Sequence, residues 1–141
     1  GIRSTNTKPE IQVRRALHAH GFRYRLHARN VPGKPDLVLP RYHAAIFING
    51  CFWHGHDCPL FRLPSTRQEF WEAKISRNVE RDAEVRCQLN GQGWRHLTIW
   101  ECALRGRNRL GLEETVTRIE RWLINMENRA AEIRAHRQTV T

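Results

Sequence analysis

Apolar residues recur at helical spacing near both ends of the chain. Thr7 is followed three residues later by Glu10, which is the spacing of an N-terminal capping box, and Gly21 is a natural stop. We therefore expect a helix over residues 8–20. A second amphipathic helix is expected over residues 112–127. Its apolar face carries Val116, Ile119, Trp122 and Leu123.

The middle of the chain predicts a longer helix. Thr66 and Glu69 repeat the capping-box spacing at its start. Gly91 and Gly93 provide the stop signals, so we expect this helix to run from about Thr66 to Gln88.

Between the helices lie four segments with strand patterns. "FRYRLH" at residues 22–27 alternates apolar and polar residues, as a half-buried strand does. "DLVLP" (36–40) and "AAIFI" (44–48) are short apolar runs bounded by Pro and Gly, and "WRHLTIW" (94–100) is similar. The order α-β-β-β-α-β-α predicts a mixed α/β domain with helices packed on one central sheet.

The length of 141 residues fits a single domain spanning residues 1–141. We expect an arm over residues 1–7 and a charged, frayed tail from about residue 128. No stretch of about 18 apolar residues occurs, so no membrane span is expected. No signal-peptide pattern opens the chain, which favours a reducing compartment where cysteines serve metal binding or catalysis.

The charge of the chain points to a polyanionic partner. The 24 basic residues outnumber the 14 acidic ones, for a net charge of +10. Only Lys8, Lys34 and Lys74 are lysines, so 21 of the basic residues are arginines. Arginine suits bidentate contact with phosphates and base edges, which favours nucleic acid over the alternative of a merely solvated basic surface.

The segment "NGCFWHGHDCP" concentrates metal ligands with aromatic residues. Cys51 and Cys58 bracket two histidines, and Cys102 follows the last predicted strand. Three cysteines and one histidine would complete a tetrahedral zinc site, but the spacing does not decide between His54 and His56. The alternatives are a Cys51–Cys58 disulfide or plain buried thiols.

Asp36 is the candidate ligand for a hard cation. It follows Pro35 at the start of a predicted buried strand, where it could also serve simply as a turn residue. A carboxylate there suits Mg²⁺, which neutralises a scissile phosphate and activates water. The histidine that does not bind zinc is available as general acid or base. Glu10 has a competing explanation in the capping box.

Phe52 and Trp53 lie inside the cysteine- and histidine-rich loop, where core residues are unexpected. Apolar side chains can insert between base steps and kink a duplex, so we interpret this pair as a DNA wedge. Trp71, in the first turns of the long helix, fits either the wedge or ordinary core packing.

Four motifs occur together between about Arg3 and Trp122: "PGKPDLVLP", "GCFWHGHDC", "STRQEFWEAKISRNVERD" and "WECALRGR". This combination resembles the very-short-patch-repair (Vsr) DNA mismatch endonucleases. The resemblance implies a restriction-endonuclease-like α/β fold, with a central mixed sheet flanked by helices and a zinc-pinned loop. It also implies Mg²⁺-dependent nicking on the 5′ side of the T in T:G mismatches that arise by deamination of 5-methylcytosine.

The resemblance also implies residue roles. Asp36 looks like the Mg²⁺ ligand, with the backbone carbonyl at Ile48 beside it, and His54 looks like the catalytic histidine that activates water. Glu10 matches a family glutamate near the active site. The structural zinc set would be Cys51, His56, Cys58 and Cys102, and the intercalating aromatics Phe52, Trp53 and Trp71.

One departure from the family pattern precedes the cysteine-rich loop. The family usually has Thr-His where this chain has Ile48 and Asn49. A side-chain role at either position would be lost, whereas a backbone carbonyl would remain.

We expect a monomer that acts on double-stranded DNA in the bacterial cytoplasm, beside the nucleoid, together with helper proteins of mismatch repair. The alternatives are a related restriction-like nuclease with another DNA substrate and a non-catalytic, zinc-containing DNA-binding module.

Overall fold

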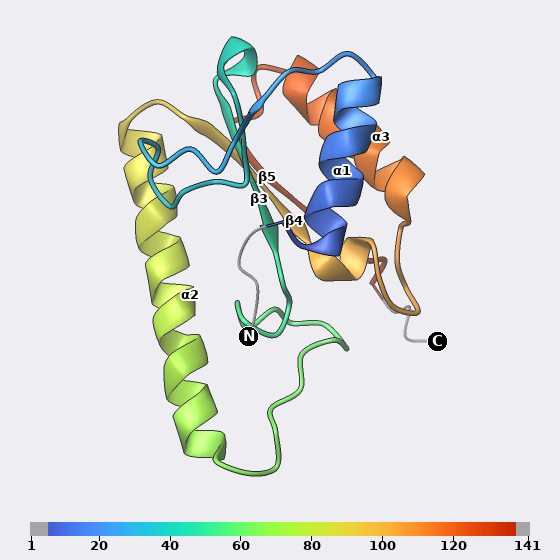
Figure 1. Ribbon diagram of the computed structural model, residues 1–141. Coiled ribbons are helices and arrows are strands. Elements are labelled where there is room, and N and C mark those ends of the chain that lie inside the picture. Colours follow the sequence, from blue (N-terminus) through green and yellow to red (C-terminus); the bar gives the residue numbers. More distant parts are fainter. Residues whose placement is uncertain (1–5, 138–141) are drawn as a thin grey trace.

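The computed structural model describes residues 6–137, which form one five-stranded mixed sheet and three α-helices (Figure 1). The helices are α1 (Lys8–Ala19), α2 (Gln68–Gly91) and α3 (Leu112–Ile124). The strands are β1 (Arg25–Leu26), β2 (Leu37–Leu39), β3 (Ala44–Asn49), β4 (Arg95–Trp100) and β5 (Ala130–Ile133). They lie in the order β1-β2-β3-β4-β5, antiparallel from β1 to β3 and parallel from β3 to β5. The predicted α/β class is confirmed.

The strand residues divide between two faces because successive side chains alternate across a sheet. One face packs against α1 and α3, which lie side by side, and α2 covers part of the other face (Figure 1). Val38 and Ala45 on the α2 side pack with Leu89 near the end of that helix. The residues of the larger core on the α1/α3 side include Val13, Leu17, Leu37, Leu39, Ile46, Leu97, Ile99, Val116, Ile119 and Leu123.

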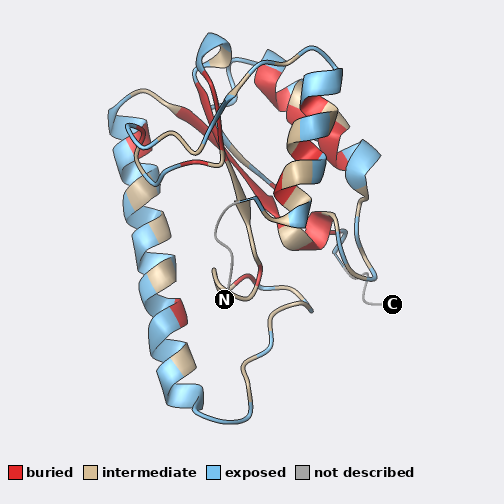
Figure 2. Cartoon of the chain, in the orientation of Figure 1, coloured by how far each residue is buried: buried red, intermediate tan, exposed pale blue. Residues whose placement is uncertain are grey.

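Helix α2 is mostly exposed, and only Ile75 and Leu89 are buried along its length (Figure 2). Its C-terminal end packs on the sheet, while its N-terminal half extends beyond the strands (Figure 1). That half therefore depends on the loop after β3 for its apolar contacts. None of the described helices is long and apolar enough to cross a membrane.

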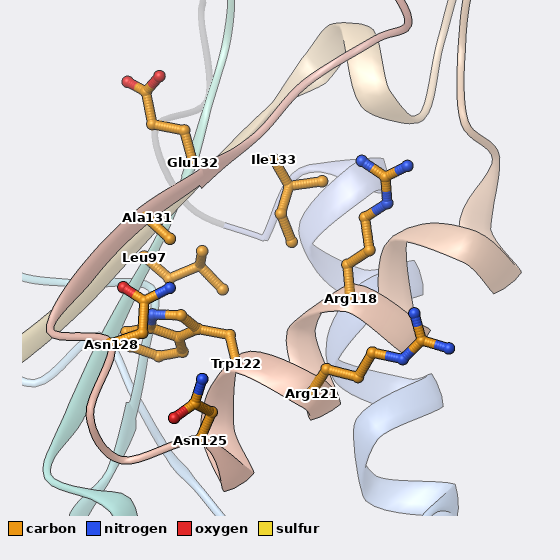
Figure 3. Close-up of a pocket in the computed structure, with 9 residues that line it drawn as sticks. All are labelled: Leu97, Arg118, Arg121, Trp122, Asn125, Asn128, Ala131, Glu132 and Ile133. Atoms are coloured by element: carbon orange, nitrogen blue, oxygen red, sulfur yellow. The ribbon is translucent and has the colours of Figure 1, made fainter.

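A buried arginine of β4 binds the C-terminal end of α3 and holds that helix against the sheet. Arg95 of β4 is only 1% exposed, and its guanidinium donates to carbonyl oxygens of Trp122, Asn125 and Asn128. It also lies 4.1 Å from the Trp122 ring centroid. These bonds satisfy carbonyl groups that the helix end leaves without intrahelical partners. A shallow hollow of about 270 Å³ lies beside this contact, between α3 and β5 (Figure 3).

Two predicted elements are shorter than the sequence suggested. The predicted strand over residues 22–27 is reduced to β1. Phe22 stays bound to the end of α1, with its N–H donating to the Leu17 carbonyl at 3.0 Å, and the left-handed His27 (φ 49°) ends the strand. Tyr24 instead donates through its hydroxyl to the Arg14 carbonyl of α1. Helix α3 ends at Ile124, three residues before the predicted end, where the Arg95 contacts begin.

The predicted capping box at Thr66 and Glu69 is wrong. Helix α2 begins at Gln68, and its N-cap is Arg67, whose φ of 55° is left-handed. No described side chain caps this end.

The expectation of a frayed tail from about residue 128 is also wrong for residues 130–133. They form β5, which pairs in parallel with β4 and buries Ile133. The predicted arm over residues 1–7 falls mostly outside the described residues, which begin at Asn6.

Candidate active site and metal centre

A cleft of about 920 Å³ opens at the carboxyl ends of β3 and β4. Acidic residues and a histidine from four parts of the chain line it: Asp36, His54, Asp82 and Glu101. Basic side chains lie around them: Lys34, Lys74, Arg81 and Arg105. An acidic centre with a basic surround suits a site where a cation and phosphate groups meet.

Asp36 sits immediately before β2 and is fixed by the neighbouring strand. Its Oδ2 accepts a hydrogen bond of 2.7 Å from the backbone N–H of Ile48 in β3. The carboxyl groups of Asp36 and Glu10 and the ring of His27 place one potential ligand atom each within 4.8 Å of one another. The structure thus brings together the predicted residues Asp36, Glu10 and Ile48.

The electrostatics of this acidic group favour a positive charge between the carboxylates. The pKa of Asp36 is raised to about 7, mainly by burial and also by the nearby Glu10 charge, which together outweigh the lowering effect of the Ile48 hydrogen bond. Two carboxylates so close in a buried setting require a proton or a cation. Hard oxygen donors are the ligands that Mg²⁺ prefers, so the two carboxylates of this group fit that ion.

Glu10 does not complete the capping box that the sequence suggested. Its N–H donates to Thr7 Oγ1 at 3.4 Å, but its carboxylate accepts from Asn6 N–H, Arg14 and His27 instead of Thr7 N–H. The carboxylate is 1% exposed and faces Asp36. Helix α1 therefore carries this acidic side chain into the site.

His54 is oriented by a carboxylate from α2. Its Nδ1 lies 2.6 Å from Asp82 Oδ2. Donation from Nδ1–H to Asp82 leaves Nε2 with a free lone pair, the state that a general base requires. A carboxylate holding a histidine in one tautomer is a recurrent arrangement in hydrolytic sites.

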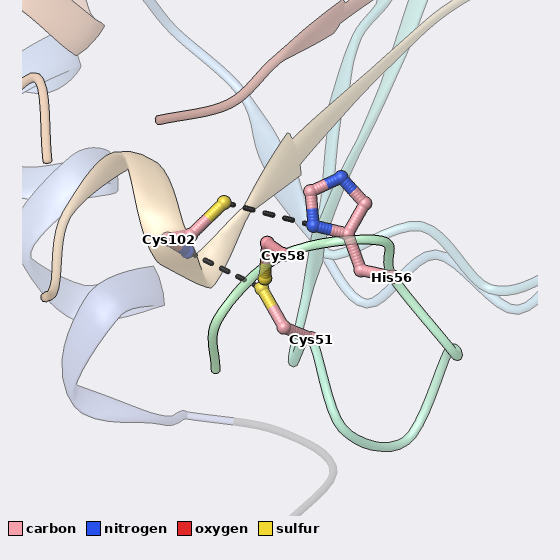
Figure 4. A group of neighbouring side chains, drawn as sticks. All are labelled: Cys51, His56, Cys58 and Cys102. Atoms are coloured by element: carbon pink, nitrogen blue, oxygen red, sulfur yellow. Dashed lines mark hydrogen bonds between the residues drawn. The ribbon is translucent and has the colours of Figure 1, made fainter. Parts of the chain in front are cut away.

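Three cysteines and His56 form a separate cluster at the end of β3 and β4 (Figure 4). One ligand atom from each of Cys51, His56, Cys58 and Cys102 lies within 4.8 Å of the others. The Nδ1 of His56 is 3.6 Å from Cys102 Sγ. Tetrahedral zinc places such nitrogen and sulfur ligands about 3.6 Å apart, so the donor set fits zinc.

All four cysteines are free, which contradicts the alternative of a Cys51–Cys58 disulfide. Burial raises the pKa of Cys51 and of Cys102, so a nearby cation would help to hold them as thiolates. Burial and the Arg134 charge lower the pKa of His56, which keeps its ring neutral as a metal ligand requires. The ring also stacks on Trp100, with centroids 4.0 Å apart.

The cysteine-rich loop is clamped against α2. Gly55 has a φ of 60°, and a Cβ added there would lie 2.9 Å from Ile75 Cγ2 and 3.2 Å from Val79 Cγ2. The Asn78 side chain donates to the Trp53 carbonyl at 2.8 Å. Only glycine allows the loop to approach the helix this closely.

The predicted wedge residues form one aromatic cluster at the cleft. Phe52 packs edge-on against Trp53 and Trp71, with ring centroids 4.9 Å and 5.6 Å away, and the two tryptophans are 5.7 Å apart. All three are half-buried. Trp71 therefore belongs with the loop aromatics and not with the sheet core.

Sequence reasoning did not assign two residues of the site. Asp82 ends the motif "STRQEFWEAKISRNVERD", but it lies 28 residues from His54 and nothing local signals their contact. His27 read as the polar position of a strand, whereas it turns toward Glu10. Both contacts arise from tertiary packing.

The chain is similar over most of its length to known DNA-cutting proteins. A family model described as DNA mismatch endonuclease Vsr matches residues 1–60. The DNA mismatch endonuclease Vsr of Escherichia coli (strain K12) is 44% identical over 122 residues, covering 86% of this chain and 78% of the relative. The type II nicking enzyme V.XorIIP of Xanthomonas oryzae pv. oryzae is 45% identical over 103 residues, covering 73% and 76%. With V.NmeAIP of Neisseria meningitidis the identity is 42% over 106 residues, covering 75% and 76%. The protein is therefore a DNA endonuclease that belongs to the Vsr family of DNA mismatch endonucleases.

Proposed function

We propose that this endonuclease nicks one strand on the 5′ side of the T in T:G mismatches, with Mg²⁺ as its catalytic cofactor. One observation carries the proposal: the Asp36 carboxylate, the His54–Asp82 pair and the aromatic residues Phe52 and Trp53 line a single cleft. Cation binding, proton transfer and base-stack opening would then occur side by side.

Asp36 and Glu10 are the proposed Mg²⁺ ligands, with the Ile48 backbone beside them. The ion, when bound, would neutralise charge on the scissile phosphate and lower the pKa of water. The Ile48 N–H holds the Asp36 carboxylate toward the cleft. Because a backbone group makes that contact, an isoleucine side chain at this position leaves it intact.

His54 is the proposed general base. Asp82 holds its Nδ1, so Nε2 remains to take a proton from the attacking water. Asp82 acts through His54 and is therefore a positioning residue.

Binding to the duplex is proposed to combine charge with stacking. Lys34, Lys74, Arg81 and Arg105 surround the cleft and are placed to meet phosphates. A T:G pair is weakened already, so opening the stack beside it costs less than at a matched pair. Phe52, Trp53 and Trp71 are the proposed wedge.

Zinc is the proposed structural metal, held by Cys51, His56, Cys58 and Cys102. It would fix the loop that carries both the wedge and His54. We further propose that the enzyme works as a monomer in the bacterial cytoplasm, with helper proteins of mismatch repair.

A related DNA substrate is the second candidate. The similar proteins named above include both a mismatch endonuclease and type II nicking enzymes, and this chain carries Ile48 and Asn49 where the family pattern has Thr-His. Asn49 lines the cleft, so a change there can alter which duplex is cut. A purely DNA-binding module is disfavoured by membership in an endonuclease family.

The test measures nicking of two duplexes that differ only at one pair, T:G or T:A, with and without added Mg²⁺. We expect strand-specific nicking of T:G only, and only with Mg²⁺. His54→Ala should lower the rate by about 10²–10⁴-fold. Asp36→Asn should lower the nicking rate by at least the same factor. Asp82→Asn should lower kcat with little change in KM.

Glu114→Gln, on the far helix α3, serves as the charge-matched control and should nick like the unaltered protein. Equal cutting of T:G and T:A duplexes would favour the second candidate. Near-normal nicking by His54→Ala would remove that residue from the mechanism.

A further inference from the structure

The ring of His56 has one nitrogen that the cysteine cluster does not use. Nδ1 faces Cys102 Sγ, while Nε2 points away and is buried without a hydrogen-bond partner among the described residues. The closest carboxylate oxygen is Asp57 Oδ1, at 3.6 Å. A small rotation of the exposed Asp57 side chain would bring these atoms into hydrogen-bonding distance.

Asp57 is itself held by the C-terminal segment. Arg134, the residue after β5, donates through Nη1 to Asp57 Oδ1 at 2.6 Å and through Nη2 to the Asp57 carbonyl at 3.0 Å. The Arg134 side chain is 22% exposed, while Asp57 is 76% exposed. A guanidinium that contacts both the carboxylate and the backbone keeps the Asp57 carboxylate beside the His56 ring, within a small rotation of Nε2.

The next residue along the chain reaches the cysteine cluster directly. The backbone N–H of Ala135 donates to Cys102 Sγ at 3.4 Å. A second backbone bond, from Cys102 N–H to Cys51 Sγ at 3.3 Å, comes from the short 3-10 helix after β4 (Glu101–Ala103). N–H donors to sulfur stabilise the thiolate form.

We propose that Asp57, Arg134 and Ala135 form the outer shell of the zinc site. Asp57 accepts a hydrogen bond from the Nε2–H group of His56 and so favours the tautomer whose Nδ1 is free for the metal. Arg134 fixes Asp57, and its charge balances the net negative charge of Zn²⁺ with three thiolates. The inference rests on the proposed zinc site and adds a functional role to the segment after β5.

Such outer partners commonly change metal affinity by about 10–100-fold when removed. Since Asp57 is largely exposed and its ion pair is screened by water, we expect the lower end of that range. The simpler explanation of the Asp57–Arg134 contact is an ion pair that only ties the loop to the sheet edge. That explanation predicts a lower melting temperature with no effect on zinc.

The experiment measures zinc release from the zinc-loaded protein into a chromophoric chelator. We expect Asp57→Ala and Arg134→Ala each to release zinc about tenfold faster than the unaltered protein. Arg134→Lys should give an intermediate rate, because it keeps the charge and loses the forked contact. Glu114→Ala and Arg118→Ala remove a comparable exposed ion pair on α3 and should leave release unchanged.

Unchanged zinc release in both Asp57→Ala and Arg134→Ala, with a lowered melting temperature, would overturn the proposal in favour of the simple ion pair. If Asp57→Ala does not fold, Arg134→Ala decides alone, because it leaves every residue of the loop in place. Protein that contains no zinc as purified would overturn the inference together with the zinc site itself. Zinc that is present but insensitive to these variants overturns only the inference.

Discussion

At the scale of single residues, the active site depends on groups held by partners from other segments. Asp36 is aligned by a strand N–H, and His54 by a helix carboxylate. Each of these two side chains is positioned by a residue that is distant in the sequence. In this way a short chain would assemble the proposed general base and cation site at the ends of two strands.

Asp36 should make the stability of the protein depend on pH. Its pKa rises from 3.8 to about 7 on folding, mainly through burial. A carboxyl group raised in this way stabilises the fold fully below about pH 4, and that contribution is lost as the pH rises through 7. Without added Mg²⁺, Asp36→Asn should therefore gain stability relative to the unaltered protein as the pH rises.

The gain should be at most about 1.4 kcal/mol per pH unit, and added Mg²⁺ should reverse it because a cation favours the carboxylate. Melting curves of both proteins between about pH 5.5 and 8 provide the check. Parallel curves with no divergence would mean that Asp36 is not the group that titrates.

The aromatic cluster gives a prediction that separates recognition from packing. Replacing Phe52 and Trp53 by Ala should weaken binding to T:G duplexes much more than binding to T:A duplexes. The reason is that the proposed wedge would exploit the lower cost of opening a mismatched stack, where unstacking costs a few kcal/mol per step. Affinities for both duplexes, with a melting curve for the double variant, are the measurement. A destabilised protein with an unchanged T:G to T:A ratio would assign the pair to packing.

At the scale of elements, the loop after β3 and the N-terminal half of α2 support each other. Gly55→Ala tests this, because its Cβ would meet Ile75 Cγ2 at 2.9 Å and its φ of 60° disfavours alanine. We expect a loss of about 2–4 kcal/mol in the free energy of unfolding, from overpacking and backbone strain together.

Gly21→Ala is the matched control, since Gly21 has a φ of 94° and nothing within 4 Å of the added Cβ. It should lose only about 1 kcal/mol, from strain alone. Equal losses at the two positions, measured by denaturant unfolding, would show that the loop and α2 do not constrain each other.

The elements that the sequence predicted well are those with a local cause. The buried strands around Leu37–Leu39 and Ala44–Asn49 come from apolar runs, and α1 from its Thr7 cap. Strand β5 is short and carries a glutamate, so only its place beside β4 makes it a strand. The role of Arg95 likewise has no local cause, because the groups that accept its hydrogen bonds lie 27 or more residues away in the sequence.

The candidate site also has some residues with a local sequence signal and others that only tertiary packing reveals. Three of the cysteine-cluster residues lie within one short segment, so their spacing indicated a metal site. The spacing alone left His54 and His56 open, and the family resemblance pointed to His56. In the fold, Nδ1 of His56 turns toward the sulfurs and His54 pairs with Asp82. Neither Asp82 nor His27 carries a local signal of its role.

At the scale of the whole molecule, the proposed function puts DNA over the cleft, which the charge of the chain would favour. The net charge is +10, and the basic residues at the cleft include Arg81, which is exposed. Affinity should fall log-linearly with salt, with a slope of about −0.9 per phosphate contact. Arg81→Ala should reduce that slope by about one unit.

Arg118→Ala is the control for this measurement, because Arg118 borders the hollow between α3 and β5 and not the cleft. Its slope should match that of the unaltered protein. The reverse result, a changed slope for Arg118→Ala alone, would move the DNA to the other side of the molecule.

The spacing of the proposed zinc ligands has a consequence for how the chain folds. Cys51, His56 and Cys58 are close in sequence and can gather around an ion before any tertiary structure exists, whereas Cys102 lies 44 residues beyond Cys58. Capturing Cys102 brings together the carboxyl ends of β3 and β4, the parallel pair whose long connection makes closure slow. Zinc would thus act as a folding template, and refolding should accelerate as free zinc rises toward saturation.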